Sequence, residues 1–212
     1  TDFLDAYNAV CSELVPVIQP PTTPFAAVAD MIADRIERGY YSNEKAYWYK
    51  NIKNIEPLLF SKNKSVLSFD VVGRKEFTVI KSISNLEQWC DKSNLSVESV
   101  LLTALARGYK KNVDFKKYKQ SHIMSVLMES HGRMFGETLR LERTVGWFTV
   151  FYPLNVVATD NSFIDDVARN CHVLETVPSK GMGFASYMMN ADSNKLPNII
   201  FNYLGESLRY KG

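Results

Sequence analysis

Two apolar strand patterns, at residues 122–129 and 144–157, constrain the fold of this chain more than any other feature. The first alternates strictly, so Met124, Val126 and Met128 are expected to share one face of a strand, opposite Ile123, Ser125, Leu127 and Glu129. The second is rich in aromatic and β-branched residues, which strands favour. Helical periodicity precedes and follows this pair. A chain that alternates strands with helices is expected to fold as an α/β domain with a mixed sheet.

The other elements follow from apolar spacing and from local start and stop signals. Thr23 followed by Pro24 predicts a helix that Thr23 caps and that Gly39 ends. Ser96 is expected to cap a later helix, because a serine hydroxyl can accept a hydrogen bond from a free amide of the first turn. The expected helices cover residues 3–14, 25–36, 43–48, 84–90, 97–105 and 161–175, and the further strands residues 66–72, 74–80 and 197–204.

Composition indicates a folded chain and argues against several partners. Of the 212 residues, 46% are hydrophobic and 12% aromatic, which is enough for a sizeable core. The net charge is only +2, which argues against nucleic acid as the main partner. No apolar run reaches the ~18 residues of a membrane helix, so no membrane partner is expected. Cys11, Cys90 and Cys171 show no Cys-x-x-Cys spacing and fit a reducing, cytoplasmic location.

The candidate chemistry lies where the first strand ends, in the run Glu-Ser-His-Gly-Arg at residues 129–133. A carboxylate that ends an apolar strand suits a general acid or base near neutral pH. An ion pair of Glu129 with Arg133 or Arg143 would make it structural instead, and the residues alone leave both interpretations open. His131 is equally open, as a catalytic or a packing residue, because the glycine after it is expected to turn the chain. No His or Cys cluster has metal-ligand spacing, so no metal site is expected.

Three motifs in sequence order carry a resemblance to a known family. Residues 129–133 are similar to the Glu-Gly-His-Gly-Arg motif of the epimerization domains of nonribosomal peptide synthetases, with Ser130 in place of the first glycine and Met134 next, where the family often has glutamate. Residues 143–153 resemble their Arg-Thr-Val-Gly-Trp-Phe-Thr-x-x-Tyr-Pro motif, and residues 201–205 match Phe-Asn-Tyr-Leu-Gly in full. Condensation domains proper normally differ in the second motif, so the resemblance favours epimerization over peptide-bond formation.

The resemblance implies the two-lobed condensation and epimerization fold, in which two chloramphenicol-acetyltransferase-like lobes form a V with a tunnel between them. Residues 1–64 are then expected to be a helical segment that links from a missing N-terminal lobe. Residues 65–212 are expected to be the C-terminal lobe, a mixed sheet flanked by helices that is incomplete at its C-terminal end. The His-His-x-x-x-Asp motif of the family belongs to the N-terminal lobe and does not occur in these 212 residues. One half of the catalytic pair would therefore lie outside this chain, and the fragment alone is expected to be inactive.

The resemblance also implies roles for individual residues. Glu129 is expected to be the catalytic acid/base that works opposite the missing histidine. His131, Trp147, Asn202 and Tyr203 are expected to bind the substrate in the tunnel. Strand alternation should turn only one of the last two directly into it.

The implied substrate is an aminoacyl or peptidyl thioester on the phosphopantetheine arm of a peptidyl carrier protein, with no cofactor bound directly. The implied reaction is epimerization from L to D at Cα, by proton abstraction and reprotonation, during biosynthesis of a peptide antibiotic. Two alternatives remain open: a condensation-type domain that forms peptide bonds, and a non-catalytic domain that only docks other proteins.

Overall fold

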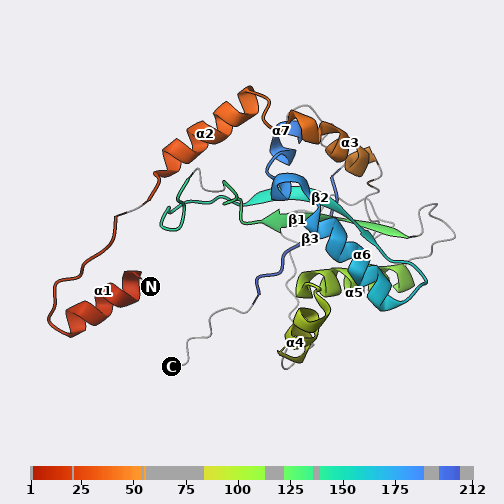
Figure 1. The fold of residues 1–212 in the computed structure, drawn as a ribbon, viewed down its shortest axis with the longest axis horizontal. Helices are drawn as coiled ribbons and strands as arrows, with labels where there is room; N and C mark the ends of the chain where they lie inside the picture. Colours follow the sequence, from red (N-terminus) through yellow and green to blue (C-terminus); the bar gives the residue numbers. More distant parts are fainter. Residues whose placement is uncertain are drawn as a thin grey trace, which may run out of the picture.

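The computed structural model describes residues 2–20, 22–53, 55, 84–112, 122–135, 139–188 and 196–205 (Figure 1). A three-stranded sheet with the strand order β2-β1-β3 lies at the centre of the described part. Its middle strand, β1 (Ile123–Ser130), pairs antiparallel with β2 (Val150–Val157). On its other side, β1 pairs in parallel with the short strand β3 (Ile200–Phe201). The predicted α/β class with a mixed sheet is confirmed.

Helices precede β1 and fill the connection from β2 to β3, as the alternation in the sequence predicts. Gly39, at φ +68°, follows α2 where the sequence predicts its end. The expected strands at residues 66–72 and 74–80 lie outside the described residues. The helices are α1 (Asp2–Cys11), α2 (Phe25–Glu37), η1 (Ser42–Glu44), α3 (Lys45–Lys53), α4 (Ser84–Ser93), α5 (Val97–Asn112), α6 (Phe163–Glu175), η5 (Pro178–Gly181) and α7 (Phe184–Met188). None of those described combines the length and the apolar character needed to cross a bilayer.

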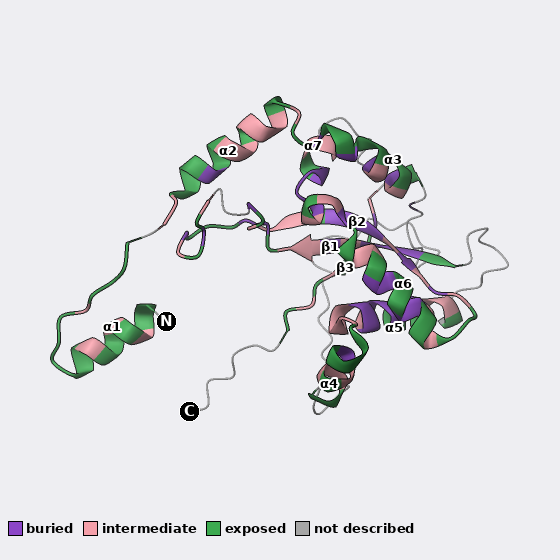
Figure 2. Ribbon diagram, viewed as in Figure 1, coloured by how far each residue is buried: buried purple, intermediate pink, exposed green. Residues whose placement is uncertain are grey.

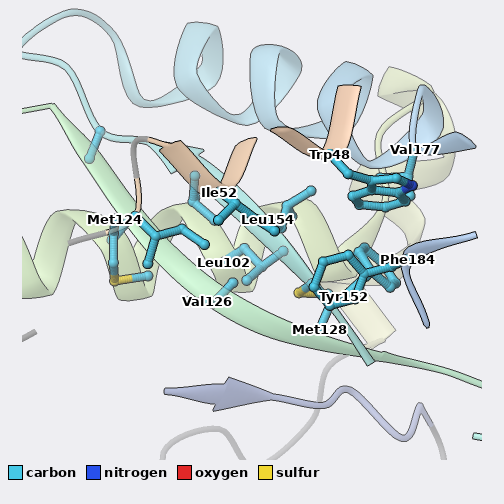
Figure 3. Close-up of a cluster of buried hydrophobic side chains, with 14 residues drawn as sticks. Trp48, Ile52, Leu102, Met124, Val126, Met128, Tyr152, Leu154, Val177 and Phe184 are labelled. Carbon is cyan, nitrogen blue, oxygen red and sulfur yellow. The ribbon is translucent and has the colours of Figure 1, made fainter. Parts of the chain in front are cut away.

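The main core lies on the face of the sheet that carries one of the two alternating sets of β1 side chains. Met124, Val126 and Met128 are each at most 2% exposed. Side chains from α3, α5, α7 and β2 complete the same cluster, among them Trp48 and Phe184 (Figure 3). Each fully buried side chain of this size contributes about 1.5–3 kcal/mol relative to its exposed state, so this cluster holds the helices against the sheet.

The N-terminal part of the chain is joined to this core through α3, whereas α1 is not. Trp48 is 1% exposed within the main cluster. Helix α1 buries none of its residues, and Figure 2 shows it as a mostly exposed element beside the body of the molecule. The division expected between residues 64 and 65 lies outside the described residues.

Two helix starts test the predicted capping signals. Ser96 caps α5 as predicted, because its hydroxyl oxygen accepts a hydrogen bond from the Ser99 amide at 3.1 Å. The predicted cap of α2 is wrong: Pro24 holds the capping position, without a side-chain cap. The Thr23 hydroxyl donates instead to the Arg140 carbonyl at 2.9 Å, which ties the start of α2 to a distant loop.

The second strand is shorter than predicted, and one arginine explains why. Residues 144–149 were expected to extend it, but β2 begins only at Val150. The Arg133 guanidinium donates to the carbonyls of Leu141 (2.8 Å), Thr144 (3.0 Å) and Gly146 (3.4 Å). Carbonyls that bind a side chain are not available to a strand ladder, so this segment forms a loop. The strand expected at residues 197–204 is likewise reduced to β3.

Candidate active site

A cavity of about 660 Å³ lies where β1 and β3 end. The residues just after each of these parallel strands form part of its wall. Residues of α5, α6, β2 and η5 form further parts. The cavity is lined by Ser96, Glu98, Glu129, Ser130, His131, Met134, Thr149, Tyr152, Cys171, Leu174, Glu175, Lys180, Asn202, Tyr203 and Leu204.

Glu129 and Asn202 are brought together by the pairing of β1 with β3. The register places Met128 beside Phe201, so the next residue of each strand lies on the opposite face of the sheet, away from the main core. There the Asn202 side-chain amide donates to Glu129 Oε2 at 2.7 Å. The carboxylate is partly exposed and lines the cavity. The first and third motifs of the sequence thus meet at one hydrogen bond.

The two arginines proposed as ion-pair partners of Glu129 are engaged elsewhere. Arg133 binds the three loop carbonyls described above, and its guanidinium lies 4.3 Å from the centre of the Phe148 ring. Arg143 donates to both carboxylate oxygens of Asp2, and this hydrogen bonding lowers the pKa of Asp2 from its ordinary value. Among the described residues no cation pairs with Glu129, so the ion pair with Arg133 or Arg143 that the sequence left open is not formed.

His131 follows β1 directly, on a sharp turn at Gly132. The φ of Gly132 is +62°, and a Cβ there would lie 1.6 Å from the Phe148 carbonyl oxygen, so only glycine fits. The turn lets the Arg133 amide donate to Nδ1 of His131 at 3.0 Å. The neutral ring then carries its proton on Nε2, which makes that nitrogen a hydrogen-bond donor at the cavity wall.

The remaining predicted site residues divide into two groups. Asn202 and Tyr203 both line the cavity, although strand alternation predicts that only one of them faces it directly. Together with Glu129 and His131 they form one site. Trp147 is 80% exposed and is not part of the cavity lining. The structure therefore brings four of the five predicted residues together and leaves the tryptophan outside.

Among the cavity residues that the sequence analysis did not assign to the site are Glu98, Tyr152 and Lys180. Burial raises the pKa of Glu98, and the charge of Lys180 partly opposes this. Burial also raises the pKa of Tyr152, and the nearby charge of Glu98 adds to the effect. The cap at Ser96 signals that Glu98 stands in a first turn, but nothing local indicates that this turn meets the end of the sheet. No three His, Cys, Asp or Glu side chains converge as a metal site in the part of the chain that the structure describes.

Comparison with known proteins identifies the family. Residues 1–208 match the family described as Condensation domain. The chain belongs to the condensation-domain family. This condensation-family chain is 30% identical over 177 residues, or 78% of its length, to bacitracin synthase 3 of Bacillus licheniformis. It spans 3% of that protein.

Solved structures of the family share the fold. The epimerization domain from the third module of tyrocidine synthetase B matches 91% of the chain with a TM-score of 0.68 at 20% identity. The first condensation domain of the calcium-dependent antibiotic synthetase matches 84% with a TM-score of 0.55 at 13% identity. The chain spans 44% and 38% of these two structures. The predicted fold, part of a condensation or epimerization domain, is confirmed, and both kinds of domain share it.

Proposed function

We propose that this chain contributes part of an epimerase active site, in which Glu129 exchanges the α-proton of an aminoacyl or peptidyl thioester. The observation that carries the proposal is the hydrogen bond from Asn202 to Glu129 at the cavity wall. It joins two of the three motifs that resemble epimerization domains. The third, at residues 143–153, supplies the loop that Arg133 anchors.

The chemistry requires little beyond positioned proton donors and acceptors. A thioester acidifies the proton on the neighbouring carbon, so a carboxylate in reach can remove it. Asn202 holds one oxygen of Glu129, which leaves the other oxygen for the substrate. The Nε2 proton of His131 is a suitable donor to the enolate oxygen that forms, because such donors stabilise developing negative charge. Return of a proton to the opposite face completes the inversion.

The proposal includes partners that extend beyond this chain. The resemblance assigns the second proton-transfer group to a histidine of an N-terminal lobe, and the substrate to the phosphopantetheine arm of a peptidyl carrier protein. The similarity to a bacitracin synthase supports a role in the synthesis of a peptide natural product. We therefore place this chain in a larger synthetase, where the cavity would be completed by the other lobe.

Exchange of the α-proton with solvent deuterium tests the assignment of Glu129. In the intact protein, loaded with an aminoacyl thioester, Glu129→Gln should lower the exchange rate at least ~100-fold, because the amide cannot accept the proton. Asn202→Ala should cause a smaller loss of ~10-fold, by releasing the carboxylate from its position. Glu142→Gln is the matched control, since Glu142 lies on the surface outside the cavity and should exchange at the wild-type rate. Exchange by Glu129→Gln at the wild-type rate would exclude Glu129 as the acid/base.

Peptide-bond formation is the second candidate, because the matched family is described as Condensation domain. Chiral analysis of the carrier-bound product separates the two reactions. An epimerase returns a mixture of L and D residues at unchanged length. A product that is all L and one residue longer would establish condensation instead.

A further inference from the structure

The cavity continues around the end of the sheet from one face to the other. Glu129 and Asn202 lie on the face turned away from the main core. Tyr152 pairs with Met128 across β1 and β2, and it shares the core face with that residue. Glu98, from the first turn of α5, lines the same cavity. The cavity therefore has a second polar wall that the proposed proton transfer does not use.

Tyr152 is the first sign that this wall binds something. Its side chain is only 6% exposed, yet it lines the cavity. A buried tyrosine hydroxyl normally finds a hydrogen-bond partner. Among the described residues the Tyr152 hydroxyl makes no hydrogen bond, and no side-chain nitrogen or oxygen there that is fully shielded from solvent lacks a partner, so this hydroxyl is open to the cavity and available to a ligand.

Glu98 places a carboxylate on the same wall of the cavity. It is half-buried and lines the cavity, and among the described residues its carboxylate makes no side-chain hydrogen bond or ion pair. Lys180 is the nearest candidate for an ion pair, but its Nζ donates to the Glu175 carbonyl at 3.4 Å and is not within 4.0 Å of the Glu98 carboxylate. A partly buried charge is unfavourable, so a cation that enters the cavity would stabilise this carboxylate.

The backbone that carries Lys180 is fixed where it stands. Ser179 and Lys180 both adopt left-handed conformations, with φ of 45° and 48°. The Ser179 hydroxyl donates to Glu44 Oε1 at 2.6 Å, and the other oxygen of Glu44 accepts from the Trp48 indole at 2.9 Å. This network joins the turn that carries Lys180 to the main core.

We infer that Glu98 and Tyr152 bind an ammonium group of the thioester substrate, an inference that rests on the proposed function. The sign of the charge favours a cation: among the described residues, the carboxylates of Glu98, Glu129 and Glu175 line the cavity, against the ammonium of Lys180. An ammonium carries three donors and can bind the carboxylate and the phenol oxygen together. Such a group is either the free α-ammonium of an aminoacyl substrate or the end of a basic side chain.

Binding of non-reactive probes to the intact protein tests the inference and separates the two sources. The probes are amide analogues of ornithinyl and norvalyl pantetheine, each with a free and an acetylated α-amine. Ornithine and norvaline differ mainly by the side-chain ammonium. For the probe with the recognised ammonium, Glu98→Gln should raise Kd about tenfold or more, and Tyr152→Phe about threefold. If the α-ammonium is recognised, the increase in Kd occurs with the free α-amine and disappears on acetylation, for both the ornithine and the norvaline probes. If the side-chain ammonium is recognised, the increase occurs only with the two ornithine probes.

The controls keep the outcome independent of folding and of the proposed reaction. Acetyl-norvalyl pantetheine amide carries no ammonium, so its Kd should not change in either variant, and Glu142→Gln should leave all four values unchanged. Equal weakening of all four probes by Glu98→Gln, no weakening at all, or no preference of the wild type for an ammonium would overturn the inference. Because the probes do not react, their binding does not depend on the proposed reaction. A wild-type protein that binds them through Glu98 but shows no deuterium exchange would contradict the epimerase proposal alone.

Discussion

The substitution Arg133→Lys tests whether Arg133 supports the loop before β2 or forms an ion pair with Glu129. Arg133 makes two strong contacts with loop carbonyls, at 2.8 and 3.0 Å, a weaker one at 3.4 Å, and a stacking contact with Phe148. A lysine ammonium can keep one strong contact but cannot reproduce the planar fork. One lost charged hydrogen bond costs about 1.5–3 kcal/mol and lost stacking about 0.5–1 kcal/mol, while the contact at 3.4 Å adds little. The free energy of unfolding should therefore fall by about 2–4 kcal/mol.

Chemical denaturation of the intact protein measures this loss, with Arg140→Lys as the matched control. The Arg140 side chain is 79% exposed, so its exchange should change the free energy of unfolding by less than about 0.5 kcal/mol. Combining Arg133→Lys with Glu129→Gln should give additive effects, because the two side chains share no contact. A loss below about 0.5 kcal/mol for Arg133→Lys, or strong coupling to Glu129, would refute the assignment of Arg133 to the loop.

Two further predictions concern stability. Gly132→Ala should lower the free energy of unfolding by at least ~2 kcal/mol, because the new methyl group would overlap the Phe148 carbonyl at a left-handed φ; an unchanged denaturation midpoint would contradict the turn geometry. Burial acts to raise the pKa of Asp166, but hydrogen bonds from Thr159 and Arg107 outweigh it, so the pKa lies below its ordinary 3.8. The charged form therefore contributes stability that is fully present above that value and lost as the pH falls through the lowered pKa, so urea midpoints between about pH 4 and pH 2 should fall more steeply in the wild type than in Asp166→Asn.

The parts of the fold that the sequence predicts well are those that local pattern determines. The division of β1 into two faces follows from alternation alone, because Met124, Val126 and Met128 all turn to the same side. The start of α5 follows from a serine and an amide three residues apart. Each of these predictions depends on residues within one turn or one strand, and each is confirmed.

The failures share a different cause, which is contact between segments far apart in the chain. The segment before β2 has strand-like composition. It forms a loop because the Arg133 guanidinium donates to the carbonyls of Thr144 and Gly146. Thr23 has the local features of a cap, but Pro24 holds the capping position, and the Thr23 hydroxyl donates to the distant carbonyl of Arg140. Glu98 belongs to the cavity only because α5 packs beside the end of the sheet. Periodicity carries no information on such contacts.

The motif at residues 129–133 contains a proposed catalytic residue, Glu129, and residues that only support the fold. This explains at which positions the chain departs from the family pattern. Ser130 replaces a glycine, and it lies inside β1 opposite Val150, where an extended backbone accepts any side chain. Gly132 is retained at the one position where a Cβ would meet a carbonyl. Met134, where the family often has glutamate, lines the cavity and is 47% exposed, so it removes a charge from the wall without disturbing the core. Since each departure falls where the fold tolerates it, neither argues against Glu129 as the acid/base.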